Sequence, residues 1–89
     1  MKPRITISLT ADRTLEIWLN AAGRDVLVAE LRALDERHEH FHLAPKDQGE
    51  VEVSTRPYHP TDDVIDYAEV LFRTDSWDER YFPHVMRTN

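Results

Sequence analysis

The densest group of residues able to do chemistry is the stretch Arg37-His-Glu-His-Phe-His-Leu43, which holds three of the chain's five histidines. His40 and His42 stand two positions apart, and in a strand such a pair leaves the same face with Cα atoms about 7 Å apart. Two imidazoles in this arrangement can converge on one metal ion, but a stable zinc site needs further ligands. The candidates for a third ligand are Glu52, then His59 and His84.

The simpler interpretation makes His40 and His42 polar residues on the solvated side of a strand. We adopt it, so the sequence predicts neither a bound metal nor a cofactor. His38 is expected at the last turn of a helix, where an imidazole suits the helix dipole.

The sequence offers no catalytic motif. Histidines near carboxylates could act as a general acid or base, but no serine or lysine stands in a recognisable nucleophile context, and cysteine is absent. Two glycines are too few for a glycine-rich phosphate loop. We therefore expect that the protein is not an enzyme.

Length and charge limit the remaining classes of function. The 89 residues predict one domain, 1–89, with a single core. Seventeen acidic against eleven basic residues give a net charge of -6, which disfavours nucleic acid and favours a basic partner. No stretch approaches the roughly 18 apolar residues of a membrane span, and the N-terminus has no apolar signal region. A cytoplasmic protein is expected.

Two runs near the N-terminus alternate apolar and polar residues with period two, the mark of half-buried strands. If residues 11–13 form the turn, Thr10 faces Thr14. This register puts all the large aliphatic side chains on one face of a hairpin. They are Ile5, Ile7, Leu9, Leu15, Ile17 and Leu19.

Asn20 is a good N-cap for an amphipathic helix over residues 21–38. Leucines recur at helical spacing, and Val28 stands at the edge of their stripe. Gly23 weakens the first turn by about 1 kcal/mol relative to alanine, so the helix could begin later than Asn20 suggests. The stripe consists of Leu27, Leu31 and Leu34.

Residues 40–44 and 50–58 predict a second hairpin, with Ala44 opposite Glu50, which puts Glu52 opposite His42. Residues 64–73 form either a strand or a short helix, and the run Val70-Leu71-Phe72 favours the strand. The segment 75–84 is expected to turn once and pack down. The sequence thus predicts an α+β fold in ββαβββ order, a mostly antiparallel five-stranded sheet with one amphipathic helix on one face.

The outer face of this sheet is the expected binding surface. Tryptophan and tyrosine are enriched at binding hot spots, and the predicted partner-binding residues are Trp18, His40, His42, Glu52 and Tyr67. Two alternatives remain: the C-terminal segment folds back over this face, or the chain forms a homodimer that buries it. A metal-binding or small catalytic module centred on His40 and His42 is a further alternative.

The order of hairpin, helix, the element His42-Leu43-Ala44-Pro45, a glycine-containing turn and an acidic-aromatic end resembles a known family. It is the family of bacterial immunity proteins numbered thirty-two in the classification of polymorphic toxins, and the similarity covers roughly residues 15–72. The resemblance implies a protein that binds and neutralises a cognate toxin without catalysis. An acidic inhibitor would suit a toxin with a basic cleft.

Overall fold

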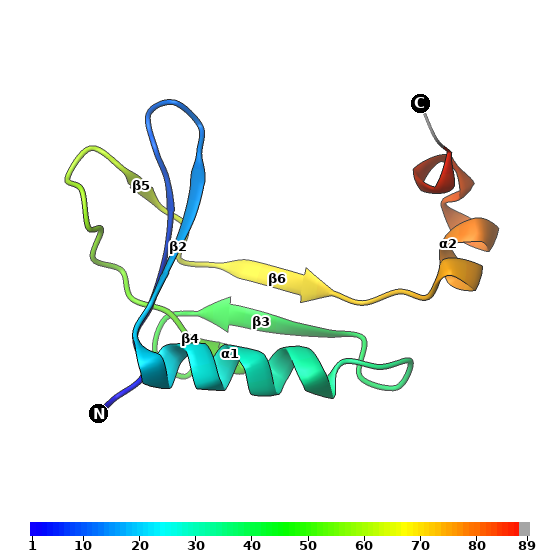
Figure 1. Cartoon of the computed structure of the whole chain (residues 1–89), viewed down its shortest axis with the longest axis horizontal. Helices are drawn as coiled ribbons and strands as arrows, with labels where there is room; N and C mark the ends of the chain where they lie inside the picture. Colours follow the sequence, from blue (N-terminus) through cyan, green and yellow to red (C-terminus); the bar gives the residue numbers. More distant parts are fainter. Residues whose placement is uncertain (88–89) are drawn as a thin grey trace.

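The computed structural model describes residues 1–87. These residues form an α+β fold with two small three-stranded sheets, ordered β2-β1-β5 and β4-β3-β6 (Figure 1). The elements are β1 (Ile5–Leu9), β2 (Leu15–Leu19), α1 (Ala21–Ala33), β3 (His40–Ala44), β4 (Val51–Glu52), β5 (Asp63–Val64), β6 (Ala68–Leu71), α2 (Asp75–Tyr81) and a 3-10 turn, η1 (Pro83–Met86). The α+β class is confirmed, whereas the single five-stranded sheet is wrong.

The first hairpin has the predicted register. Leu9 lies opposite Leu15, and Ile7 opposite Ile17. The backbone N–H of Thr10 donates to the carbonyl of Thr14 at 2.9 Å, which closes the loop over residues 11–13. Turn length and apolar alternation agree on one register, and this agreement made the hairpin predictable.

The aliphatic side of β2, however, is not part of the core. Ile7 is 6% exposed, whereas its cross-strand partner Ile17 is 53% exposed. Leu15 and Leu19 are exposed as well. The hairpin rises away from α1, which lies across its base, so the helix does not cover β2 along its length (Figure 1). The expectation that all six aliphatic side chains share a buried face is therefore wrong for β2.

Helix α1 begins where Asn20 predicts and ends earlier than residue 38. The side chain of Asn20 accepts a hydrogen bond from Gly23 N at 2.7 Å, which caps the first turn. After Ala33 the chain becomes extended, and the Asp35 carboxylate accepts from the backbone N–H of His38. The helix therefore ends at Ala33, and the Asp35 side chain stabilises a separate turn at residues 35–38. His38 lies in that turn, not on the helix.

Gly23 is needed at the start of α1. A Cβ atom at this position would lie 2.4 Å from the carbonyl oxygen of Arg4 and 3.0 Å from the side chain of Ile5. The missing side chain therefore lets the helix approach the backbone of β1 closely.

The second predicted hairpin is not formed, because β3 and β4 are parallel. Leu43 pairs with Val51, and Ala44 with Glu52. The intervening loop folds back along β3, so that a Cβ on Gly49 would lie 2.8 Å from the carbonyl oxygen of His42. Apolar alternation defines which side chains share a face but not the strand direction, and for that reason the pairing of Ala44 with Glu50 was wrong.

The region 64–73 is extended and not helical, as the sequence favours, but it is divided between the two sheets. β5 pairs with β1 and β6 pairs with β3, both antiparallel. Ser54 N donates to the carbonyl of Ile5 at 2.7 Å, and Ile65 N donates to that of Ile7 at 2.8 Å. Each connection therefore leaves one sheet and reaches the other, and the strands cannot form a single layer.

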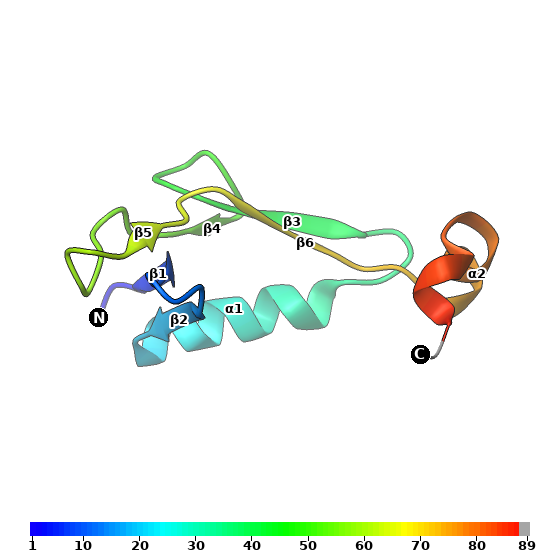
Figure 2. The same cartoon turned by 90° about the horizontal axis from the view of Figure 1, so that it is seen from above.

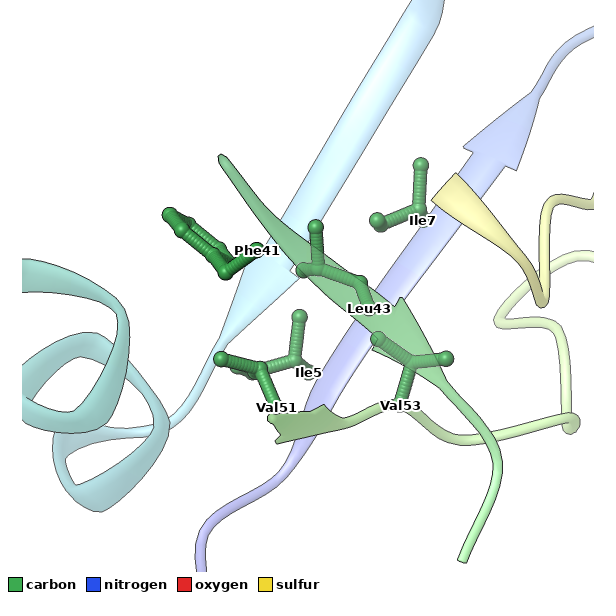
Figure 3. Close-up of a cluster of buried hydrophobic side chains, with 6 residues drawn as sticks. All are labelled: Ile5, Ile7, Phe41, Leu43, Val51 and Val53. Carbon is green, nitrogen blue, oxygen red and sulfur yellow. The ribbon is translucent and has the colours of Figure 1, made fainter. Parts of the chain in front are cut away.

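The core lies where β1 crosses β3 (Figure 3). The side chains of both sheets meet there, and from one side α1 adds Val26 and Leu27, joined by its C-cap residue Leu34. Leu31 of the predicted stripe is 45% exposed. Figure 2 shows α1 on one side of β3 and β6, which leaves their opposite face uncovered by this helix. The buried cluster is Ile5, Ile7, Phe41, Leu43, Val51 and Val53.

The C-terminal segment does not pack back on the sheets. It forms α2, capped by Thr74, and η1, which stand apart from the first hairpin (Figure 1). The radius of gyration is 15.2 Å, against about 12 Å for a compact chain of this length. Among residues 1–87, no helix has both the length and the apolar character needed to cross a bilayer.

Candidate partner-binding face

His40 and His42 lie together on the outer face of β3. Phe41 and Leu43 point into the core, so the alternation of the strand turns both histidines outward. Their rings meet edge to face, with centroids 5.0 Å apart. The prediction that these imidazoles leave the same face is confirmed.

Two carboxylates contact the imidazole of His42. Its Nδ1 lies 3.3 Å from Glu50 Oε1, and its Nε2 lies 3.7 Å from Glu69 Oε2. Glu69 is the cross-strand partner of His42 on β6. Both ring nitrogens of His42 are therefore engaged by acidic groups of the protein.

Glu50 also binds the backbone of β3. The backbone N–H of His42 donates to Glu50 Oε1 at 2.8 Å. This hydrogen bond, followed by the interactions with the His42 and His40 side chains, lowers the pKa of the Glu50 carboxyl below its ordinary value of 4.5. The glutamate is thus held in its charged form beside the histidines.

Glu52 does not lie opposite His42, as the antiparallel hairpin would have required. It pairs with Ala44 in the parallel register, and its carboxylate lies 4.0 Å from Lys2 Nζ. The parallel register places Glu52 two residues further along β3 than the predicted hairpin did. Glu50 and Glu69 lie beside the His42 imidazole instead.

Tyr67 joins the two histidines. Its ring centroid lies 6.1 Å from that of His42, and the residue is 60% exposed. Leu71, at the other end of β6, pairs with His40 and is 57% exposed. We call the group His40, His42, Glu50, Tyr67, Glu69 and Leu71 the histidine-carboxylate face.

Trp18 lies on the other sheet and is half-buried. Its ring stacks on Tyr58 with centroids 4.1 Å apart, and His59 approaches its edge at 6.0 Å. The segment 54–62 therefore covers the outer face of the first sheet, on which Thr6 and Ser8 are fully buried. The two coverings expected from the sequence were the C-terminal segment and a second copy of the chain, and neither is the 54–62 segment.

In the part of the chain that the structure describes, His40 and His42 have no third donor atom grouped with them. Among residues 1–87, neither belongs to a group of three histidine, cysteine or acidic side chains whose donor atoms come within 4.8 Å of one another. Of the three candidate third ligands, His59 belongs to a group of this kind, together with Glu16 and Asp62. Glu52 and His84 belong to none within residues 1–87.

The sequence analysis did not name Glu50 or Glu69 as binding residues, although the pattern of the predicted hairpin places Glu50 on the same face as the two histidines. The alternation of β6 could have placed Glu69 on the face of Tyr67, since the two residues are two positions apart. Glu50 reaches His42 only through the fold of the 45–50 loop, for which the sequence holds no periodic signal.

Comparisons with known proteins return no relative. No protein-family model matches the chain, and neither the curated proteins nor the solved structures contain a significant match.

Proposed function

We propose that this chain is a small cytoplasmic binding protein that occludes a basic protein partner, as its resemblance to the immunity proteins implies. The observation that carries the proposal is the histidine-carboxylate face. There an exposed tyrosine and an exposed leucine stand beside Glu50 and Glu69. A cognate toxin is the partner class that the resemblance suggests.

The chemistry of this face suits a protein partner. Tyr67 and Leu71 offer apolar area that a partner can bury, and tyrosine is enriched at binding hot spots. The surrounding carboxylates and the net charge of -6 would attract a basic surface and speed encounter. The same charge opposes binding to nucleic acid. We propose no enzymatic activity, because the sequence has no serine or lysine in a recognisable nucleophile context, no cysteine and no glycine-rich phosphate loop.

A capture experiment tests the proposal. The tagged protein is recovered from its native cells as wild type and as Tyr67→Ala, with Tyr81→Ala as the matched control. Tyr81 is 55% exposed but lies on α2, away from the face. A basic protein bound in one-to-one ratio to wild type and to Tyr81→Ala, but lost with Tyr67→Ala, supports the proposal.

The second step asks whether binding inhibits. The purified chain should abolish the activity of the recovered protein, and its association should slow as salt concentration rises. Capture without inhibition would leave a binding protein that is not an immunity protein. A partner that still binds Tyr67→Ala would show that the histidine-carboxylate face is not the binding site.

A second candidate role, homodimerisation, is favoured by β2. This strand is at the edge of its sheet and carries exposed Leu15, Ile17 and Leu19. Edge strands with an apolar side are templates for pairing with another chain. Light scattering at micromolar concentration distinguishes the roles: a doubled mass that Ile17→Lys halves would assign β2 to a dimer.

A further inference from the structure

We propose a binding site for a divalent transition-metal cation of the zinc class, formed by Glu16, His59 and Asp62 on the outer face of the first sheet. One donor atom from each of these side chains lies within 4.8 Å of those of the other two. The site is separate from the histidine-carboxylate face and does not depend on the function proposed for it.

Local structure brings the three ligands together. His59 and Asp62 are the ends of a turn closed by Asp62 N donating to the His59 carbonyl at 3.0 Å. Pro60, which follows His59, has the backbone angle that such a turn needs. Glu16 projects from β2, and the stack of Trp18 on the neighbouring Tyr58 anchors the turn above that strand.

Unpartnered polar atoms support the site. Four buried side-chain atoms in residues 1–87 have no hydrogen-bond partner, and all four belong to residues of this region. Two of them are carboxylate oxygens of the proposed ligand residues, Glu16 Oε1 and Asp62 Oδ2. The others are the Trp18 indole nitrogen and the hydroxyl of Ser8. Buried polar atoms without partners are costly, and a bound cation would satisfy both carboxylates.

Ser8 is the most buried of the four residues that carry an unpartnered atom. The residue is 0% exposed and lies directly opposite Glu16 in the β1–β2 pair, so their side chains share one face. Its hydroxyl is therefore enclosed on the face from which Glu16 projects, and no group of residues 1–87 hydrogen-bonds to it.

The charge of the surroundings also favours a cation. The ligands line a surface hollow with Asp12, and its described lining contains three carboxylates and neither lysine nor arginine. The remaining lining residues are Thr10, Ala11, Thr14 and Thr61. A divalent cation would neutralise charge that no basic side chain of this lining offsets.

The ligand set indicates the class of metal. One imidazole and two carboxylates are ligands that zinc accepts, and three protein ligands leave a position for water. Zinc holds such ligands at about 2.1 Å, which separates the donors of a tetrahedral site by about 3.4 Å. The donor atoms lie within 4.8 Å of one another, so binding requires a small closure, which we assign to the exposed side chain of His59. The bound ion would tie the 54–62 segment to β2.

The test is calorimetric titration of the full chain with zinc. We expect one ion per chain, with affinity reduced by roughly tenfold or more in His59→Gln and Asp62→Asn. His40→Gln is the matched control, because it removes a histidine of the other face, and its affinity should equal that of wild type. Binding lost with His40→Gln and retained by His59→Gln would overturn the proposal, as would no binding to wild type.

A spectroscopic readout places the ion. In a Trp77→Phe background, Trp18 is the sole tryptophan, and its ring lies 6.0 Å from that of His59. Cobalt used as the probe should quench this emission, and zinc should compete. Glu16→Gln, which keeps the shape of the side chain, should weaken the quenching. Unchanged emission at saturating cobalt would contradict a site at His59, and far-UV dichroism verifies that each variant is folded.

Discussion

The aromatic ring of Trp18 on β2 stacks on that of Tyr58, with centroids 4.1 Å apart and planes 11° from parallel. This contact joins the first hairpin to the 54–62 segment, which closes the outer face of β1. It explains why Thr6 and Ser8, which alternate with core residues, are themselves buried. A strand that the sequence predicted to be half-solvated is thereby covered on both sides.

Tyr58→Ala should release this covering segment. We expect unfolding free energy to fall by about 0.5–1.5 kcal/mol, the usual value of an aromatic pair beyond its area. Urea denaturation followed by Trp18 emission in the Trp77→Phe background measures the change. Tyr67→Ala is the control and should change stability by less than about 0.5 kcal/mol, because Tyr67 is more exposed. Equal losses would show that the stack does not hold the segment.

Ile7 and Ile17 provide a matched pair, since they lie opposite each other in one hairpin. Ile7→Ala should cost about 2–5 kcal/mol, because the side chain is buried in the core. Ile17→Ala should cost under about 1 kcal/mol, because the residue is 53% exposed. Denaturation of the two variants at low protein concentration compares them. Similar costs would mean that another surface covers β2 in solution.

Gly23→Ala should destabilise the fold although alanine favours helices. The gain in helix propensity is about 1 kcal/mol. The new Cβ would meet the Arg4 carbonyl oxygen at 2.4 Å, and such overpacking costs about 1–3 kcal/mol. We therefore expect a lower thermal midpoint. Ala29→Gly, at an exposed position of α1, is the control and should lose about 1 kcal/mol. A higher midpoint for Gly23→Ala would refute the close approach.

Glu50 should contribute stability that depends on pH. Its pKa is depressed in the folded protein, first by the backbone hydrogen bond from His42. A depressed carboxyl pKa stabilises the fold above the ordinary value of 4.5, and this stability is lost as pH falls through the lower folded pKa. Wild type should therefore exceed Glu50→Gln in stability at neutral pH.

Denaturation from neutral pH down to about pH 3 checks this expectation. The difference between wild type and Glu50→Gln should shrink below 4.5, the ordinary pKa of the group. Glu36→Gln, an exposed change in the turn after α1, is the control. A difference that persists at the lowest pH would assign the effect to the altered shape of the side chain.

Local patterns in the sequence determined several features of the fold. Period-two alternation together with a three-residue turn left one register for β1 and β2 that keeps the aliphatic residues in phase. Asn20 marked the start of α1, because a side-chain acceptor is needed for its first N–H groups. Alternation also turned His40 and His42 outward. Each of these features depends on residues close together in the chain.

Only the tertiary structure decided which surfaces are covered and which distant residues meet. Alternation marks an apolar side of β2 but cannot show that α1 ends its coverage at the base of the hairpin. It is equally consistent with parallel and antiparallel strands, so the fold of the 45–50 loop determined that Glu50, not Glu52, reaches His42. Glu16 and His59 meet because the 54–62 segment docks on Trp18. Such contacts depend on chain closure over long separations, which no local pattern encodes.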